Sequence, residues 1–142
     1  MSTDTSLTLL AFDYGLRRIG VASGQTLIGT SAPLTTVSAR DGKPDWSQIE
    51  RLFQDWRPDQ VIVGLPTHAD GRKHPLHEPI HKFVRQLEGR FNVPISLIDE
   101  HLSSVEAEDR GATPGALDAA AACIILDTWL NEFRREKRKS DD

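Results

Sequence analysis

Three acidic residues stand where the sequence otherwise predicts buried secondary structure. Asp13 lies in LLAFDYGLRRIGVASG (residues 9–24), a run that is typical of two apolar strands joined by a tight turn. Glu100 closes the predicted strand at 93–100, and Asp118 lies in the first turns of the predicted final helix. An ionised carboxylate in an apolar strand is costly to bury unless a partner or a cation compensates its charge. Asp13 therefore predicts one or the other.

Asp118 lies on the apolar face of its predicted helix. The residues that share this face, at i+4, i+7 and i+11, are Ala122, Ile125 and Trp129. We therefore expect Asp118 to face the sheet. If one strand carries Asp13 and a parallel neighbour ends at Glu100, the three carboxylates meet at one sheet edge. Like charges that close stay ionised only with compensating cations, and carboxylate oxygens favour Mg²⁺ or Mn²⁺.

Each acid also has a simpler interpretation. Asp13 is suited to capping the bend at Tyr14 and Gly15. Asp118 is suited to the positive end of the helix dipole, an interaction worth about 0.3 to 1 kcal/mol. Asp99 alternates with Glu100 along its strand, so we expect it on the other face or in solvent. Spacing alone leaves the metal site and these alternatives open.

The pattern of apolar residues predicts a mixed α/β fold in a single domain, residues 1–142. The predicted strands are 7–13, 17–23, 29–38, 60–66 and 93–100, and the predicted helices are 45–56, 75–91, 103–111 and 114–135. A three-strand meander followed by two β-α units predicts a sheet with helices packed on it and no barrel. The sequence ARDGKP (39–44) is a turn signal. The charged tail from about residue 136 is expected to be frayed.

Charge and composition limit the classes of function. The chain has 17 Lys and Arg against 21 Asp and Glu, a net charge of -4, so it is not a generic polyanion binder. Any contact with nucleic acid has to be local or assisted by cations. The single Cys123 excludes an internal disulfide. The N-terminus lacks the features of a signal peptide and no apolar run has the length of a membrane span, so we expect a cytoplasmic protein.

Four motifs, in this order, extend over nearly the whole chain: FDYGLRRIGVASG, VIVGLPTHADG, IDEHLSSVEA and LDAAAACIIL. Together they resemble the bacterial YqgF family, described as Holliday junction resolvases and regarded as nucleases that mature the small-subunit ribosomal RNA precursor. The resemblance implies an RNase H-like fold, with three antiparallel strands, then two parallel strands, and helices on both faces. It also implies a metal-dependent phosphodiesterase whose acids fall on Asp13, Glu100 and Asp118.

The resemblance also suggests a mechanism and a substrate. Asp13 would bridge two Mg²⁺ or Mn²⁺ ions about 3.5 to 4 Å apart, with Glu100 and Asp118 at the outer positions, so that one ion activates water and the other stabilises the leaving 3′ oxygen. The favoured partner is an RNA precursor, with branched DNA as the alternative, bound by a monomer or weak homodimer. The candidate contacts to the nucleic-acid backbone are Arg17, Arg18, Arg72, Lys73, His74 and His101, each of which is otherwise a solvated charge.

The chain departs from the family pattern at three places. His101 stands where the family usually has Arg, which removes a permanent charge. The segment before Asp118 is shorter than expected, and its approach, TPGALD, contains no basic residue. The loop after GLP reads THADGRK. These departures affect substrate binding more than the metal site.

Other features of the sequence suggest competing interpretations. HEPIH (77–81) matches the zinc-protease pattern, but Pro79 is expected to interrupt the helix that the two histidines need. The aromatic residues at helical spacing, Trp46, Phe53 and Trp56, are expected to pack against the sheet and not to stack on bases. A nucleotide binder of the actin or sugar-kinase type requires two such domains, and this chain has length for one. A nucleic-acid-binding module without turnover stays open.

Overall fold

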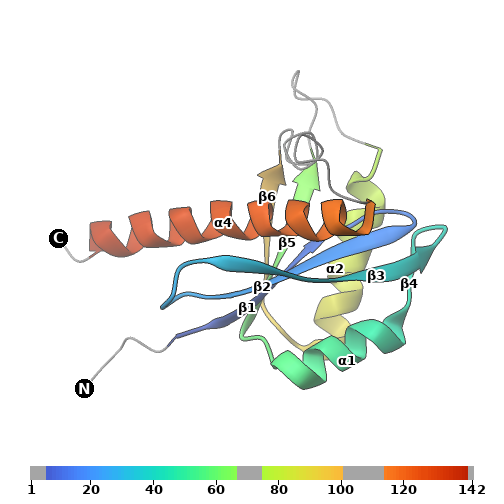
Figure 1. The fold of residues 1–142 in the computed structure, drawn as a ribbon, viewed down its shortest axis with the longest axis horizontal. Helices are drawn as coiled ribbons and strands as arrows, with labels where there is room; N and C mark the ends of the chain where they lie inside the picture. The colour runs from blue at the N-terminus through green and yellow to red at the C-terminus, as the bar shows by residue number, and fades with distance from the viewer. Residues whose placement is uncertain (1–5, 67–74, 101–113, 141–142) are drawn as a thin grey trace.

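The computed structural model describes residues 6–66, 75–100 and 114–140 (Figure 1). Its strands are β1 (Thr8–Asp13), β2 (Arg18–Gln25), β3 (Ser31–Arg40), β4 (Lys43–Pro44), β5 (Gln60–Pro66) and β6 (Ile95–Glu100). Its helices are α1 (Trp46–Trp56), α2 (His77–Phe91) and α4 (Pro114–Ser140). The predicted helix at 103–111 and the loop at 67–74 lie outside the described residues.

All six described strands form one mixed sheet in the order β4-β3-β2-β1-β5-β6. Strands β1 to β4 pair antiparallel, whereas β1, β5 and β6 run parallel. This arrangement confirms the predicted fold, with one addition. The turn at Asp41 and Gly42, both with positive φ, folds the chain back so that Pro44 pairs with Ala39 and forms the short strand β4. Two residues are too few for a sequence pattern to reveal.

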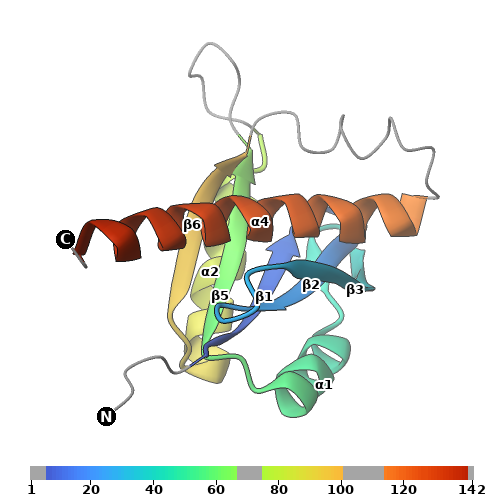
Figure 2. The same cartoon turned by 60° about the vertical axis from the view of Figure 1, so that its left-hand side comes forward.

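Helices cover both faces of the sheet, α1 and α2 on one and α4 on the other (Figures 1 and 2). The alternation along β1 explains the two layers. Leu10 and Phe12 belong to the core under α1 and α2, whereas Leu9 and Ala11 belong to the core under α4. Asp13 follows in the second set, so its position is on the α4 face of the sheet.

Local signals set the bounds of α1. The carboxylate of Asp45 caps the helix by accepting a hydrogen bond from the backbone nitrogen of Ser47 at 3.1 Å, and the helix ends where Arg57 adopts the left-handed conformation. Trp46 and Phe53 pack against the core as predicted. Trp56, in the last turn of the helix, is more exposed, at 39%, and lines a pocket together with residues of β3, so it lies beside the sheet without being buried in the core.

Two helices differ from the prediction. Helix α2 continues through Pro79, so the expectation that this proline interrupts the helix was wrong. Pro79 occupies the first turn, where a backbone N–H has no partner within the helix, and the missing donor costs little there. Helix α4 extends five residues past the predicted end at Arg135 to Ser140, through most of the expected frayed tail. The sequence REKRK contains only good helix formers, which explains the extension.

Within the described ranges, we find no helix with the length and apolarity needed to cross a membrane.

Candidate active site

Asp13 is the last residue of β1 and lies at the centre of the sheet. Its Cα partner on the antiparallel side is Gly20 of β2, and the parallel neighbour β5 runs alongside, with Phe12 opposite Val63. The residue is half-buried. Asp13 is thus at the point where the carboxyl end of a parallel strand meets the antiparallel hairpin.

Glu100 is the last residue of the parallel strand β6, so it lies, like Asp13, at the edge of the sheet formed by the carboxyl ends of the parallel strands. It lies opposite Pro66, the last residue of β5, and β5 separates β6 from β1. Figure 2 shows β5 and β6 ending side by side. Ile98, two residues earlier, is buried in the core under α4, so the alternation assigns position 100 to the α4 face. Asp99 is exposed, as predicted, and the side chain of Glu100 lies outside the described residues.

Asp118 is fixed above this edge by a close approach of α4 to β2. The backbone of Asp118 lies directly against Gly20, so closely that a Cβ on Gly20 would overlap the Asp118 carbonyl group. A larger residue at position 20 would force the helix away, which is a physical reason for glycine here. Because Gly20 is the Cα partner of Asp13, this approach brings the start of α4 over the end of β1.

The predicted face of α4 is confirmed. Ala122 and Ile125 are buried in the core beneath the helix, and Trp129 packs against that core. The side chain of Asp118, on the same face one turn earlier, is 24% exposed. It is therefore neither a surface acid nor fully buried, as a ligand at the edge of a cleft would be.

The Asp118 carboxylate has a cationic partner. Nε of Arg18 lies 2.8 Å from Oδ2 of Asp118 in a charged hydrogen bond. Arg18, the first residue of β2, is a predicted nucleic-acid contact, and here its guanidinium binds a candidate metal ligand instead. Arg17 is exposed beside it, whereas Arg72, Lys73, His74 and His101 lie outside the described residues.

Two of the three predicted metal ligands have side chains within the described structure. Asp13 and Asp118 offer carboxylate oxygens, the ligands that Mg²⁺ and Mn²⁺ prefer. Among the side chains that are described, which exclude that of Glu100, no group of three or more His, Cys, Asp or Glu could hold a metal ion. The fold therefore brings two of the three predicted acids, and the backbone of the third, to one face and edge of the sheet.

Comparison with protein families agrees with this fold. The model of the RuvX family, described as Holliday junction resolvase, matches residues 7–132. The chain belongs to the RuvX family. RuvX is the YqgF family that the sequence motifs resemble, so that prediction is confirmed.

Curated relatives of this RuvX-family chain carry one name, "Putative pre-16S rRNA nuclease". The relative from Sodalis glossinidius is 48% identical over 134 residues, which cover 89% of this chain and 95% of the relative. The relative from Edwardsiella ictaluri is 47% identical over 136 residues, with 89% and 97% covered.

Solved structures of low identity share the fold. One is Thermus thermophilus RuvC in complex with a Holliday junction substrate, with a TM-score of 0.54, 15% identity, and coverage of 90% of this chain and 96% of that one. Another is the fowlpox virus Holliday junction resolvase, with a TM-score of 0.56, 13% identity, and coverage of 89% and 99%. At these identities the likeness shows the fold alone, and it confirms the RNase H-like architecture.

Sequence reasoning misses a histidine at the same edge. His77, the first residue of α2, lies with Nε2 3.1 Å from the carbonyl oxygen of Pro66, which ends β5 opposite Glu100. The ring of His81, one turn later, lies 6.0 Å away in an edge-on arrangement. In the sequence this pair is conspicuous only as a zinc-protease pattern. The position of His77 in the sequence could have indicated this placement. A helix that follows a parallel strand begins near the carboxyl edge of the sheet, and His77 stands where such a helix is predicted.

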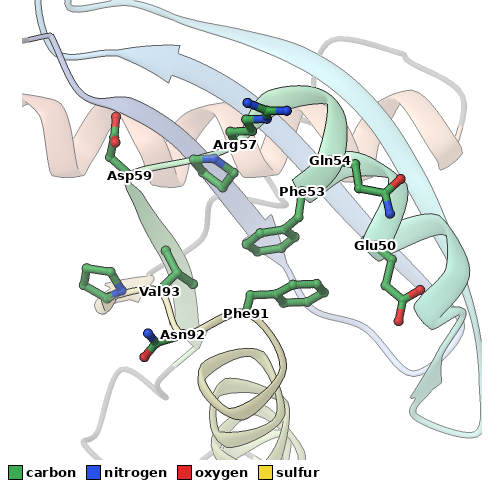
Figure 3. A pocket seen from close by; sticks show the side chains of 10 residues that line it. Glu50, Phe53, Gln54, Arg57, Asp59, Phe91, Asn92 and Val93 are labelled. Carbon is green, nitrogen blue, oxygen red and sulfur yellow. The ribbon is translucent and has the colours of Figure 1, made fainter.

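A cavity of about 750 Å³ lies far from the acids of this RuvX-family chain (Figure 3). It is bordered by the carboxyl ends of α1 and α2 and by the residues just before β5 and β6, such as Asp59 and Pro94. Phe53 and Phe91 stack within it, with ring centroids 3.8 Å apart. The cavity is thus at the opposite end of the parallel strands from Asp13. Because it contains none of the three predicted acids, it is not the candidate active site.

Proposed function

We propose that this chain is a divalent-metal-dependent nuclease that hydrolyses phosphodiester bonds in the small-subunit ribosomal RNA precursor, at its 5′ end. The proposal is supported by the sheet register, in which Asp13 and Glu100 end the parallel strands β1 and β6, and by the contact of the Asp118 backbone with Gly20, the Cα partner of Asp13. The name shared by relatives of 46–48% identity supports the RNA substrate. A cytoplasmic location is part of this proposal.

The three acids share one task in this proposal. Asp13, on a central strand, would hold the metal ions together with Asp118 and Glu100. When bound, Mg²⁺ or Mn²⁺ would supply the acidity that activates water and the charge that stabilises the leaving oxygen. The protein contributes position: β1 and β6 are fixed by the sheet, and Gly20 holds the start of α4 against β2. No side-chain nucleophile is required.

Substrate binding is assigned to a small group of cations. Arg17 is exposed at this edge, and Arg18 is half-exposed, with a relative side-chain exposure of 52%. With a net charge of -4 the chain offers no broad basic surface, so we assign it few phosphate contacts. Arg72, Lys73 and His101 are proposed as further contacts from the sequence alone. Binding is therefore expected to be weak and sensitive to salt.

A second candidate function is cleavage of four-way DNA junctions. It is favoured by the description of the RuvX family as Holliday junction resolvase, since the family model matches residues 7–132. Symmetric cleavage of a junction requires two active sites and hence a dimer, whereas trimming an RNA end requires one copy. The two functions therefore differ in substrate and in the required oligomeric state.

The test is a cleavage assay of the purified chain on 5′-extended ribosomal RNA precursor and on four-way junctions, with Mg²⁺, Mn²⁺ or a chelator. We expect metal-dependent cleavage of the RNA, lost by several orders of magnitude in Asp13→Asn. Asp99→Asn is the matched control, because it removes the same charge from an exposed position on the other face. Cleavage of the junction but not the RNA would reverse the ranking. Equal cleavage by Asp13→Asn would refute the nuclease site, and metal-independent binding without cleavage of either substrate would favour a binding module.

A further inference from the structure

The ion pair between Arg18 and Asp118 places a cation of the protein's own on a carboxylate that the proposed function assigns to a metal. The contact runs from Nε to Oδ2 at 2.8 Å. A carboxylate bound by a guanidinium has part of its donor capacity occupied and its charge compensated. In this structure Arg18 therefore supplies the compensation that a metal ion would supply in the loaded protein.

The two partners differ in their freedom to move. The backbone of Asp118 is fixed, because α4 contacts β2 at Gly20 without room for a Cβ atom. Arg18 sits at the start of β2 with about half of its side chain exposed, 52% against 24% for Asp118. A long, half-exposed side chain reaches other positions at small cost, whereas a helix packed on the sheet does not. If the pair separates, Arg18 is the partner that leaves.

We propose that Arg18 is an exchangeable counter-ion of Asp118, displaced when a divalent metal binds and thereby released to contact a phosphate of the nucleic acid. The inference rests on the proposed function and adds a regulation to it. Metal binding breaks the Arg18 contact, and the guanidinium, no longer paired with a carboxylate of the protein, becomes available to a phosphate. Metal loading and substrate binding are thereby coupled, and the coupling is reciprocal.

If the metal has to displace Arg18, the ion pair lowers the metal affinity of the natural chain by a measurable factor. A partly exposed ion pair is worth little, so removing it strengthens metal binding by only about two- to fivefold. We therefore expect Arg18→Gln to bind Mn²⁺ about two- to fivefold more tightly than the natural chain in isothermal titration calorimetry without nucleic acid. Arg18→Lys, which keeps a cation but loses the planar guanidinium, should lie in between.

Arg17→Gln is the matched control, because it removes the same charge from the adjacent, exposed arginine. It should change the Mn²⁺ affinity by less than twofold, which separates release of the ion pair from the general effect of one positive charge less.

A second measurement observes the exchange directly. In the metal-free protein the Nε–H proton of Arg18 should give a protected signal in a ¹H–¹⁵N spectrum, and the signal should shift and lose protection on addition of Mg²⁺. Asp118→Asn should remove the protection without metal.

The outcomes separate this inference from the proposed function. Tighter binding by Arg18→Gln but not by Arg17→Gln, with loss of the Nε protection, supports the exchange. Asp13-dependent Mn²⁺ binding of equal affinity in the natural chain and in Arg18→Gln overturns the exchange and leaves the nuclease site intact. Absence of Mn²⁺ binding in all these variants overturns both.

Discussion

The contact between Gly20 and the start of α4 leads to a prediction whose sign can be worked out from the structure. In Gly20→Ala the new methyl carbon would overlap the carbonyl group of Asp118 and lie 2.8 Å from the nitrogen of Ala119. Non-bonded carbon atoms prefer separations of about 3.5 to 4.0 Å, and the three nearest atoms all belong to the backbone, which no rotamer change can move away. The helix has to retreat from β2.

Overpacking of this kind costs about 1 to 3 kcal/mol. For a chain of this size roughly 4 °C of Tm corresponds to 1 kcal/mol, so Gly20→Ala should lower Tm by about 4 to 12 °C. Because Asp118 moves with the helix, and a misplacement of about 1 Å costs on the order of 100-fold in rate, cleavage should fall by about that factor in the protein that remains folded.

Gly89→Ala is the matched control for this substitution. Gly89 lies exposed in α2, and a Cβ atom at this position would meet no other atom within 4 Å, so alanine gains helix propensity there without a clash. It should raise stability by up to about 1 kcal/mol. Differential scanning calorimetry of both variants and a cleavage assay at a temperature where both are folded test the prediction. If the two alanine variants have the same Tm and the same cleavage rate, the close approach that positions Asp118 is refuted.

Three further predictions concern pH and salt. Burial raises the pKa of Tyr14, whose hydroxyl donates to the carbonyl of Gly42 at 2.7 Å, so the native state holds this proton more strongly than the unfolded chain does. The contribution of the protonated Tyr14 to stability should therefore be lost as pH rises above about 10. In Tyr14→Phe the fall of Tm at alkaline pH should be less steep. The hydrogen bond from the Ser47 side chain lowers the pKa of Asp45, so the ionised Asp45 stabilises the native state above the ordinary aspartate pKa, and this stabilisation is lost as pH falls below it. Asp45→Ala should lower Tm at pH 7 and make Tm fall less steeply at acid pH. Binding to a single-stranded RNA oligonucleotide, measured by fluorescence anisotropy, should vanish by a few hundred millimolar salt, and nanomolar binding of a four-way junction at physiological salt would favour the junction function instead.

Much of the site's placement could be predicted from sequence because it depends on periodicity. The alternation in the strand that ends at Glu100 predicted the exposed position of Asp99, and the helical spacing of Asp118 with Ala122 and Ile125 predicted the buried face of α4. The strand at 60–66 was predicted to the residue, since a short apolar run bounded by polar residues and proline has sharp ends.

The features that sequence could not supply depend on tertiary contacts. The pairing of Arg18 with Asp118 joins residues 100 positions apart and requires the crossing of α4 over β2. The role of Gly20 depends on the same crossing. Trp56 follows the helical spacing of Trp46 and Phe53, but it lines a pocket beside β3 and is 39% exposed. A pattern along one helix carries no information on how closely the neighbouring strands pack against each of its turns.

The most direct test of the central claim is the Mn²⁺-induced change in Tm of the natural chain, Asp13→Asn and Asp99→Asn, measured by calorimetry. At a metal concentration about 100 times Kd, binding to the native state stabilises it by about 2.7 kcal/mol, which corresponds to roughly 10 °C here. We predict this shift in the natural chain and in Asp99→Asn, and its loss in Asp13→Asn. An equal shift in all three proteins would contradict the assignment of Asp13 as a metal ligand.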